Sequence, residues 1–200
     1  MFAMALEVRE GTRRDTAAKI LDSAFRSITD VGLSRTTVED VARLSGVARQ
    51  TVYRYYPSKE HLIVALLLRE EEKFLDGIRT AFAPQSDLEQ ACREGILFCL
   101  RFAREHPLLG RLLETDAETF LPFLTTRAEP VVARAREALI ELIATKAWVR
   151  AALLEQAVDT AVRMVISYTL TPSSRRPQDV ARDLARLLTL ALTGREATAR

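Results

Sequence analysis

Histidine and cysteine, which most often bind metals or carry catalysis, occur only twice each in this 200-residue chain. His61 and His106 have no partner at the short spacing of zinc motifs, and the Glu-x-x-His pairs of a di-iron bundle are missing. The sequence also lacks an aspartate-rich diphosphate motif, a glycine-rich phosphate loop and a Gly-x-Ser-x-Gly motif. These absences argue against an enzyme, and no metal or cofactor is expected.

The two cysteines lie seven residues apart on one predicted helix. This spacing separates Cys92 and Cys99 by about 10 Å along the helix axis, too far for a disulfide. We expect two buried thiols, which fits a reducing cytoplasm. The chain start lacks the pattern of a signal peptide, and no apolar run is long enough to span a membrane. A cytoplasmic protein without a membrane partner is therefore expected.

Glycine and proline are also few, with seven of each. Alanine, leucine, arginine and glutamate are abundant, which favours helices, and long alternating runs typical of strands are absent. Hydrophobic residues make up 48% of the chain and charged residues 28%, as in a globular protein. The net charge of +2 excludes a uniformly basic coat but allows a local basic patch.

The most informative segment spans residues 36–60 and reads TTVEDVARLSGVARQTVYRYYPSKE. Thr37 and Asp40 have the spacing of a helix start, and Gly46 suits a sharp turn with positive φ. Val47 and Val52 can pack a second short helix against the first. Two short helices joined in this way form a helix-turn-helix, whose second helix enters the DNA major groove.

The second helix of this pair is basic. Between Val47 and Lys59 the chain carries three cations and no carboxylate, which is the sign that a DNA-facing surface needs. The alternative is an ordinary helical hairpin with a solvated basic face, for example in an adaptor that binds other proteins.

The run GVARQTVYRYYPSKEHL resembles the signature of the TetR family of transcriptional regulators. The residues that carry the resemblance are Gly46, Val47, Thr51, Val52, Tyr53, Tyr55, Tyr56, Ser58 and Lys59. With the preceding helix it covers the first quarter of the chain. The resemblance implies a DNA-binding domain followed by a helical domain that binds a ligand and dimerises.

Three residues at the start of the second helix are the candidates to read bases. Arg49 can donate two hydrogen bonds to guanine, Gln50 can pair with adenine, and Thr51 can contact a thymine methyl group. The resemblance places base readout at these same positions.

Phosphate contacts are expected around this helix. The resemblance places them at Tyr53, Tyr55, Lys59 and at Thr36 or Thr37. Arg35 can reach a phosphate or can only solubilise its loop, and Tyr56 is expected in the core. A cation at a helix N-terminus, such as Lys59, is disfavoured by the helix dipole, and a nearby phosphate would offset this.

Helical periodicity and helix-breaking residues predict an all-α fold of about nine helices. A flexible arm at 1–11 precedes a DNA-binding domain at 12–60 and a ligand-binding and dimerisation domain at 61–200. The expected helices are 12–31, two short helices within 36–60, 59–82, a helix capped at Ser86 that ends near Glu105, 107–114, 129–146, 150–170 and 177–193, with a break region near Pro122. Capping boxes are expected at Ser86 with Glu89 and at Thr115 with Glu118.

Aromatic and sulfur-containing side chains in the second domain could line an apolar cavity or simply fill the core. They are Phe98, Phe102, Phe120, Phe123, Trp148, Met164 and Tyr168. The polar groups that could orient a ligand there are Cys99, Tyr168 and Thr169.

The last two predicted helices carry apolar stripes. The first stripe comprises Val158, Ala161, Val162, Val165 and Ile166, and the second Leu184, Leu187, Leu188, Ala191 and Leu192. The resemblance implies that these helices meet a second copy in a four-helix interface, whereas a purely internal core is the alternative.

These patterns and the resemblance to the TetR family together imply a dimeric repressor that binds a palindromic DNA operator. A small apolar or aromatic effector is expected to release it. A helical adaptor is the alternative, and a helical-bundle enzyme is a more remote one.

Overall fold

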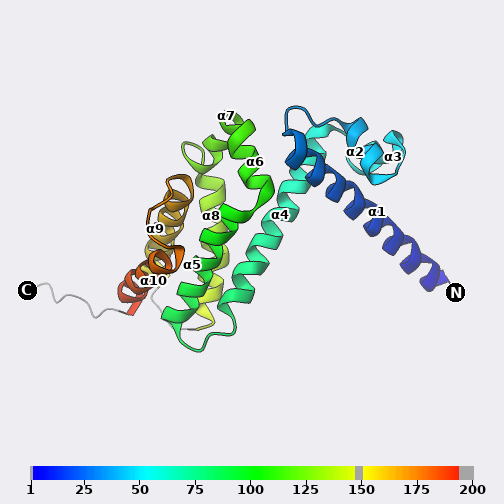
Figure 1. Cartoon of the computed structure of the whole chain (residues 1–200). Helices are drawn as coiled ribbons and strands as arrows, with labels where there is room; N and C mark the ends of the chain where they lie inside the picture. Colours follow the sequence, from blue (N-terminus) through cyan, green and yellow to red (C-terminus); the bar gives the residue numbers. More distant parts are fainter. Residues whose placement is uncertain (1, 147–150, 194–200) are drawn as a thin grey trace, which may run out of the picture. The chain divides into compact units, whose positions relative to one another are not determined.

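The computed structural model describes residues 2–146 and 151–193, without the side chains of residues 2–11, 123, 151 and 152. In this part of the chain all regular structure is helical (Figure 1). The elements are α1 (Phe2–Val31), α2 (Val38–Ser45), α3 (Arg49–Tyr55), α4 (Lys59–Phe82), α5 (Leu88–Glu105), α6 (Pro107–Thr115), α7 (Ala117–Phe120), the 3₁₀ helix η1 (Leu121–Leu124), α8 (Glu129–Ala144), α9 (Ala151–Leu170) and α10 (Pro177–Thr193). The predicted all-α fold is confirmed.

Most predicted helix bounds agree with the structure, and the differences have local causes. Helix α1 begins at Phe2 rather than near Thr12, because the residues before Gly11 are mostly good helix formers. Whether residues 1–11 act as a flexible arm stays a prediction.

Both capping boxes predicted in the second half of the chain are wrong. Helix α5 is capped by Asp87, whose carboxylate accepts the N–H groups of Glu89 and Gln90 at 3.3 and 2.8 Å, so Ser86 is not the cap. The hydroxyl of Thr115 bonds to the carbonyl of Arg111 and to the carboxylate of Asp116, and within the described residues it accepts no N–H from the following helix.

Packing divides the chain into two compact units. The first contains Met1–Glu72 and Pro107–Ala117, and the second contains Lys73–His106 and Glu118–Arg200. The first unit thus includes the beginning of α4 and all of α6 in addition to the three N-terminal helices. The functional bounds 12–60 and 61–200 stay a prediction.

The first unit is built around the buried faces of α1, α2 and α4. The apolar side chains that are at most 2% exposed at its centre are Ile20, Ala24, Ile28, Val41, Val52, Leu62 and Leu66. Each buried aliphatic side chain of the size of Val, Leu or Ile contributes about 1.5–3 kcal/mol relative to an exposed one. This core fixes how α2 and α3 are presented.

The second unit has α5 packed along α10 and α9, while α8 packs on α9 (Figure 1). Helix α10 is strongly amphipathic, with buried residues at the spacing of one helical face. These residues are Val180, Ala181, Leu184, Ala185, Leu188 and Leu192. They join α5 and α9 in one continuous hydrophobic core.

None of the helices in residues 2–146 and 151–193 combines the length and apolar character needed to cross a bilayer.

Candidate nucleic-acid interface and apolar cavity

Helices α2 and α3 form the predicted helix-turn-helix. Thr37 caps α2 in a complete capping box with Asp40. Gly46 ends α2 at φ 70°, and its N–H reaches the carbonyls of Ala42 and Arg43, so the chain turns sharply there. The predicted cap and the predicted turn are both confirmed.

Helix α3 is attached to the unit by a single fully buried side chain, Val52. Its N-terminus lacks a side-chain cap, and the N–H groups of Thr51 and Val52 bond to the carbonyl of Ala48. Arg49 and Gln50 are exposed, whereas Thr51 is half-buried. The helix therefore presents its first turn outward, as a helix that reads bases must.

Arg49 already has partners in this structure. Its guanidinium lies 2.5 Å from Glu39 of α2, donates to the Tyr53 hydroxyl at 3.2 Å and sits 5.3 Å from the Tyr53 ring centre. The hydrogen bond to Tyr53 and the charge of Glu39 raise the pKa of Arg49, which stays charged. Glu39 was missed at the sequence level, because nothing in the spacing of α2 shows that its carboxylate reaches α3.

The two tyrosines at the end of α3 differ from each other in their neighbours. Tyr55 is half-buried, with the guanidinium groups of Arg13 and Arg54 at 6.0 and 5.9 Å from its ring centre. Tyr56 is half-buried too, and burial raises its pKa. Arg13 is a further cation near this surface that the sequence prediction did not include.

Of the two threonines expected near a phosphate, Thr36 has its side chain buried in this structure, and the DNA contact of either stays a prediction. The side chain of Thr36 is 3% exposed, its hydroxyl donates to the carbonyl of Gly32 at 2.9 Å, and Ser27 lies 3.1 Å away. Its N–H also bonds to Gly32. The neighbouring Thr37 and Arg35 are exposed.

Lys59 donates from Nζ to the carbonyl oxygens of Leu33 and Ser34 at 3.0 and 3.5 Å. These carbonyls follow the end of α1, and they stabilise the cation at the N-terminus of α4 without any phosphate. An ammonium has three donors, so one can still face DNA. The phosphate contact of Lys59 stays a prediction.

A cavity of about 120 Å³ lies in the second unit, between α4, α5, α8, α9 and α10. Its lining consists of Phe74, Ile78, Phe82, Cys92, Gly95, Ile96, Cys99, Val131, Ala135, Leu139, Ile143, Val158, Ala161, Val162, Val165, Ile166 and Leu188. Among these described residues none is charged, and none has a hydroxyl or amide side chain. An engineered apolar cavity of about 150 Å³ stays dry and binds benzene, so this cavity has room for a ligand of about that size.

Of the side chains expected at a ligand that the structure describes, Cys99 alone is among the residues that line this cavity. Phe98 and Phe102 instead form an aromatic cluster with Phe74, with ring centres 4.9–5.9 Å apart. Phe74 is the member of this cluster that reaches the cavity. Met164 packs against the core.

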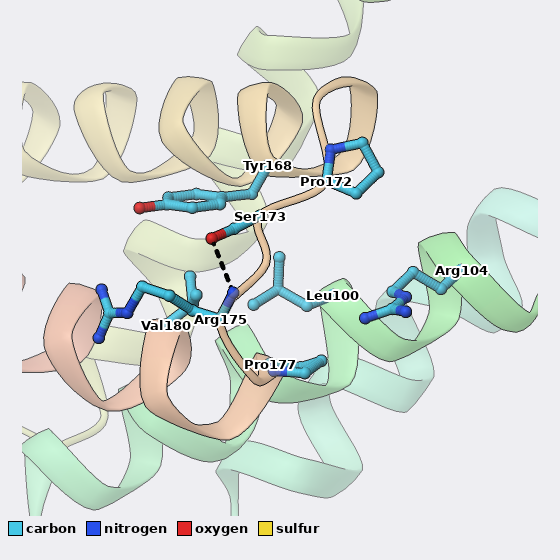
Figure 2. Close-up of a pocket in the computed structure, with 8 residues that line it drawn as sticks. All are labelled: Leu100, Arg104, Tyr168, Pro172, Ser173, Arg175, Pro177 and Val180. Carbon is cyan, nitrogen blue, oxygen red and sulfur yellow. Dashed lines mark hydrogen bonds between the residues drawn. The ribbon is translucent and has the colours of Figure 1, made fainter.

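The remaining predicted ligand residues lie elsewhere. Phe120 ends α7 and is half-buried, while Trp148 and the side chain of Phe123 lie outside the described residues. Figure 2 shows Tyr168 in a separate hollow of about 20 Å³, beside Ser173 and Arg175. A hollow of this volume has room for roughly one water molecule.

The cavity lining was missed because it consists mainly of aliphatic and small residues. Gly95 and Ala135 leave space that larger side chains would fill. Small residues within an apolar helix face were therefore the sequence signal that could have indicated the cavity. Burial raises the pKa of both Cys92 and Cys99 to about 12. Both are free thiols at neutral pH and add to the apolar lining.

The apolar stripes of the last two helices are largely used inside the unit. Val158, Val162, Leu184, Leu188 and Leu192 are buried. Leu187 and Leu190 of α10 are 59% and 57% exposed. Only a narrow part of the predicted interface therefore faces outward.

Two family models match the chain. Residues 20–66 match the model described as bacterial regulatory proteins, tetR family, and residues 87–189 match the model described as bacterial tetracyclin repressor, C-terminal domain. The HTH-type transcriptional regulator AlkX of Mycobacterium tuberculosis is 31% identical over 183 residues, covering 86% of this chain and 84% of that protein.

Solved structures agree with this match. The chain is similar to the TetR family repressor AlkX from Dietzia sp. strain DQ12-45-1b, implicated in biodegradation of n-alkanes, with a TM-score of 0.65 and 28% identity over 88% of this chain and 92% of that one. The regulator FadR from Bacillus subtilis, in complex with stearoyl-CoA, shares the fold at a TM-score of 0.54 and 16% identity, covering 89% of this chain and 98% of that one.

Proposed function

Because the chain belongs to the TetR family of DNA-binding transcriptional regulators, we propose that it is a repressor released from its operator by a small hydrocarbon. It is a regulator and not an enzyme. A DNA operator and a small-molecule effector are the partners that membership implies. Repression is supported by the similarity to a TetR family repressor at 28% identity.

The observation that carries the choice of effector is the composition of the cavity. The only described lining side chains with any hydrogen-bonding capacity are two thiols, which are weak donors and acceptors, and a buried polar group without a partner costs about 1–3 kcal/mol in proteins. A charged group is far more costly to bury. An uncharged hydrocarbon fits these walls best, and the similarity to a repressor implicated in n-alkane biodegradation supports the same class.

The operator is read by the first turn of α3. Arg49, Gln50 and Thr51 contact bases, and to do so Arg49 exchanges Glu39 for guanine. Tyr53, Tyr55, Lys59, Thr37 and Arg35 supply the phosphate contacts that set the register. Exposure of Arg49 and Gln50 and the anchoring of α3 by Val52 support this division.

A dimer places two copies of α3 on one palindromic operator. Half-sites lie about 34 Å apart, or a multiple of this distance, so both copies bind only in a matching arrangement. The exposed Leu187 and Leu190 on α10 support an interface between copies through the last two helices.

Helix α4 connects the cavity with the DNA-binding helices. It begins with Lys59 in the first unit and contributes Phe74, Ile78 and Phe82 to the cavity. A hydrocarbon that favours one arrangement of these helices shifts the population away from the arrangement that binds DNA.

A binding experiment with three six-carbon probes tests this proposal. The operator is first selected from random oligonucleotides, and its release is then followed by fluorescence anisotropy with n-hexane, benzene or hexanoate. The hydrocarbons should weaken operator binding about tenfold, within the usual range of coupling between sites, whereas hexanoate should have no effect. Release by hexanoate alone, or by none of the probes, would refute the hydrocarbon effector.

A further inference from the structure

The carboxylate of Asp116 is the acceptor for four donors at the end of α6. Asp116 is 8% exposed, and its oxygens accept the N–H of Leu33 at 3.0 Å, the N–H of Ser34 at 3.2 Å, and the hydroxyls of Ser34 and Thr115. It forms no ion pair with any cation in the described residues. The successive N–H groups of Leu33 and Ser34 make an anion-binding nest, and Asp116 occupies it.

The loop that forms this nest is pressed closely against α6. Gly32 has φ 91°, and a Cβ atom at this position would lie 2.9 Å from Oγ1 of Thr115 and 3.4 Å from Asp116. Arg111 adds a second link, because its guanidinium donates to the carbonyl of Asp30 at 3.0 Å. The end of α1 and the loop after it are therefore held by α6 at two points.

The same loop determines where α2 begins. Lys59 binds the carbonyls of Leu33 and Ser34 while Asp116 binds their N–H groups, so these peptide groups are fixed from both sides. Thr37, three residues after Ser34, is the cap of α2. Because Asp116 accepts the N–H groups of Leu33 and Ser34, a displacement of Asp116 would move the segment that leads into α2.

Helix α6 belongs to the first unit by packing but is flanked by the second unit in sequence. Residues 107–117 pack with the DNA-binding helices, whereas the chain before and after them, 73–106 and 118–200, forms the unit with the cavity. Helix α5, which ends at Glu105 and is joined to Pro107 by His106 alone, lines the cavity with Cys92, Gly95, Ile96 and Cys99.

We propose that Asp116 is the positioning residue through which the state of the cavity reaches the DNA-binding helices, by way of the N–H groups of Leu33 and Ser34. This inference rests on the proposed function, because it requires that filling the cavity alters operator binding. It assigns the coupling to one carboxylate, in addition to the continuous helix α4.

A double-mutant cycle tests the proposal without any ligand. Gly95→Leu fills part of the cavity from α5, and a Cβ at Gly95 meets Ile78 and Phe82 only at 3.8 Å, so the backbone accommodates it. Asp116→Asn keeps the shape of the side chain and removes its charge. Operator affinity is measured for the wild type, both single variants and the double variant.

The cavity-filling change should lower operator affinity about tenfold in the protein with Asp116. In the Asp116→Asn background the same change should alter operator affinity by no more than about twofold. A difference of this size is about the deviation from additivity that unconnected substitutions show. Asp87→Asn is the matched control, because Asp87 also accepts two backbone N–H groups but lies in the second unit. It should leave the tenfold effect intact.

The outcomes separate the two proposals. An equal effect of Gly95→Leu with Asp116 and with Asp116→Asn would overturn the role of Asp116 and leave the proposed function standing. No effect of Gly95→Leu or of a second filler, Ala135→Phe, in any background would overturn both.

Hydrogen exchange gives an independent readout. The amides of Leu33 and Ser34 should lose protection in Asp116→Asn and keep it in Asp87→Asn. Unchanged protection in Asp116→Asn would also overturn the proposal.

Discussion

Gly77 in α4 leaves space that the ring of Phe98 from α5 occupies, and Gly77→Ala should destabilise the protein. A Cβ atom at Gly77 would lie 2.0 Å from Cζ of Phe98 and within 2.7 Å of both neighbouring ring carbons. The ring cannot remain where it is. It is held there by Phe74 and Phe102, whose ring centres are 5.9 and 5.7 Å away.

Opposing contributions determine the size of the effect. Forcing a methyl group into a packed site costs about 1–3 kcal/mol, and a weakened aromatic pair adds about 0.5–1.5 kcal/mol. Alanine in place of glycine inside a helix returns about 1 kcal/mol. We therefore expect the free energy of unfolding to fall by about 0.5–3.5 kcal/mol in Gly77→Ala.

Gly95→Ala is the matched control on the facing helix. A Cβ at Gly95 lies 3.8 Å from Ile78 and Phe82, which is ordinary van der Waals contact. Only the helix propensity changes, so this variant should be more stable by up to about 1 kcal/mol. The same substitution in two adjacent helices is thus expected to have opposite signs.

Urea unfolding followed by circular dichroism measures both variants against the wild type. If Gly77→Ala equals or exceeds the wild type in stability, then the Phe98 ring does not point at Gly77 and the reasoning fails. Loss of stability in both variants would contradict the control.

Three further predictions concern the DNA interface, the dimer and acid stability. Arg49→Ala should weaken operator binding about tenfold and relax discrimination at one base pair in a selection experiment, while uniform weakening on all sequences would make it a phosphate contact. Leu187→Glu should convert a dimer of about twice 22.4 kDa into monomers in light scattering, and an unchanged dimer would move the interface elsewhere. Burial raises the pKa of Asp116, but the hydrogen bonds that its carboxylate accepts lower the pKa by more than burial raises it. The pKa of Asp116 therefore lies below the ordinary value of a carboxyl group. Its stabilisation is therefore present above an ordinary carboxyl pKa of about 3.9 and is lost as the pH falls through the lower folded pKa, and acid unfolding of Asp116→Asn should be less steep there.

The sequence predicted the fold and the DNA-binding segment well because both depend on local signals. Thr37, Gly46 and Ser58 each act on neighbours within a few residues, and the N–H of His61 indeed bonds to Ser58. Family membership, predicted from the run that begins at Gly46, is confirmed by the match over most of the chain.

The cavity could not be predicted in the same way, because it depends on which helix faces meet. Phe98 and Phe102 were expected at a ligand, but they pack on Phe74 beside Gly77. Thr36 and Thr37 are adjacent in sequence, yet one is buried against Ser27 and the other is exposed. Such differences arise from contacts between residues far apart in the chain, which spacing alone does not contain.

The attachment of α3 through Val52 separates the side chain that holds the helix in place from the side chains that the helix exposes. Because Arg49, Gln50 and Arg54 are exposed, substitutions at these positions change what the helix contacts without emptying the interior. The operator preference of this regulator can therefore be re-engineered by exchanging surface residues of α3. The effector response that we propose for the cavity of the other unit would carry over to the new operator.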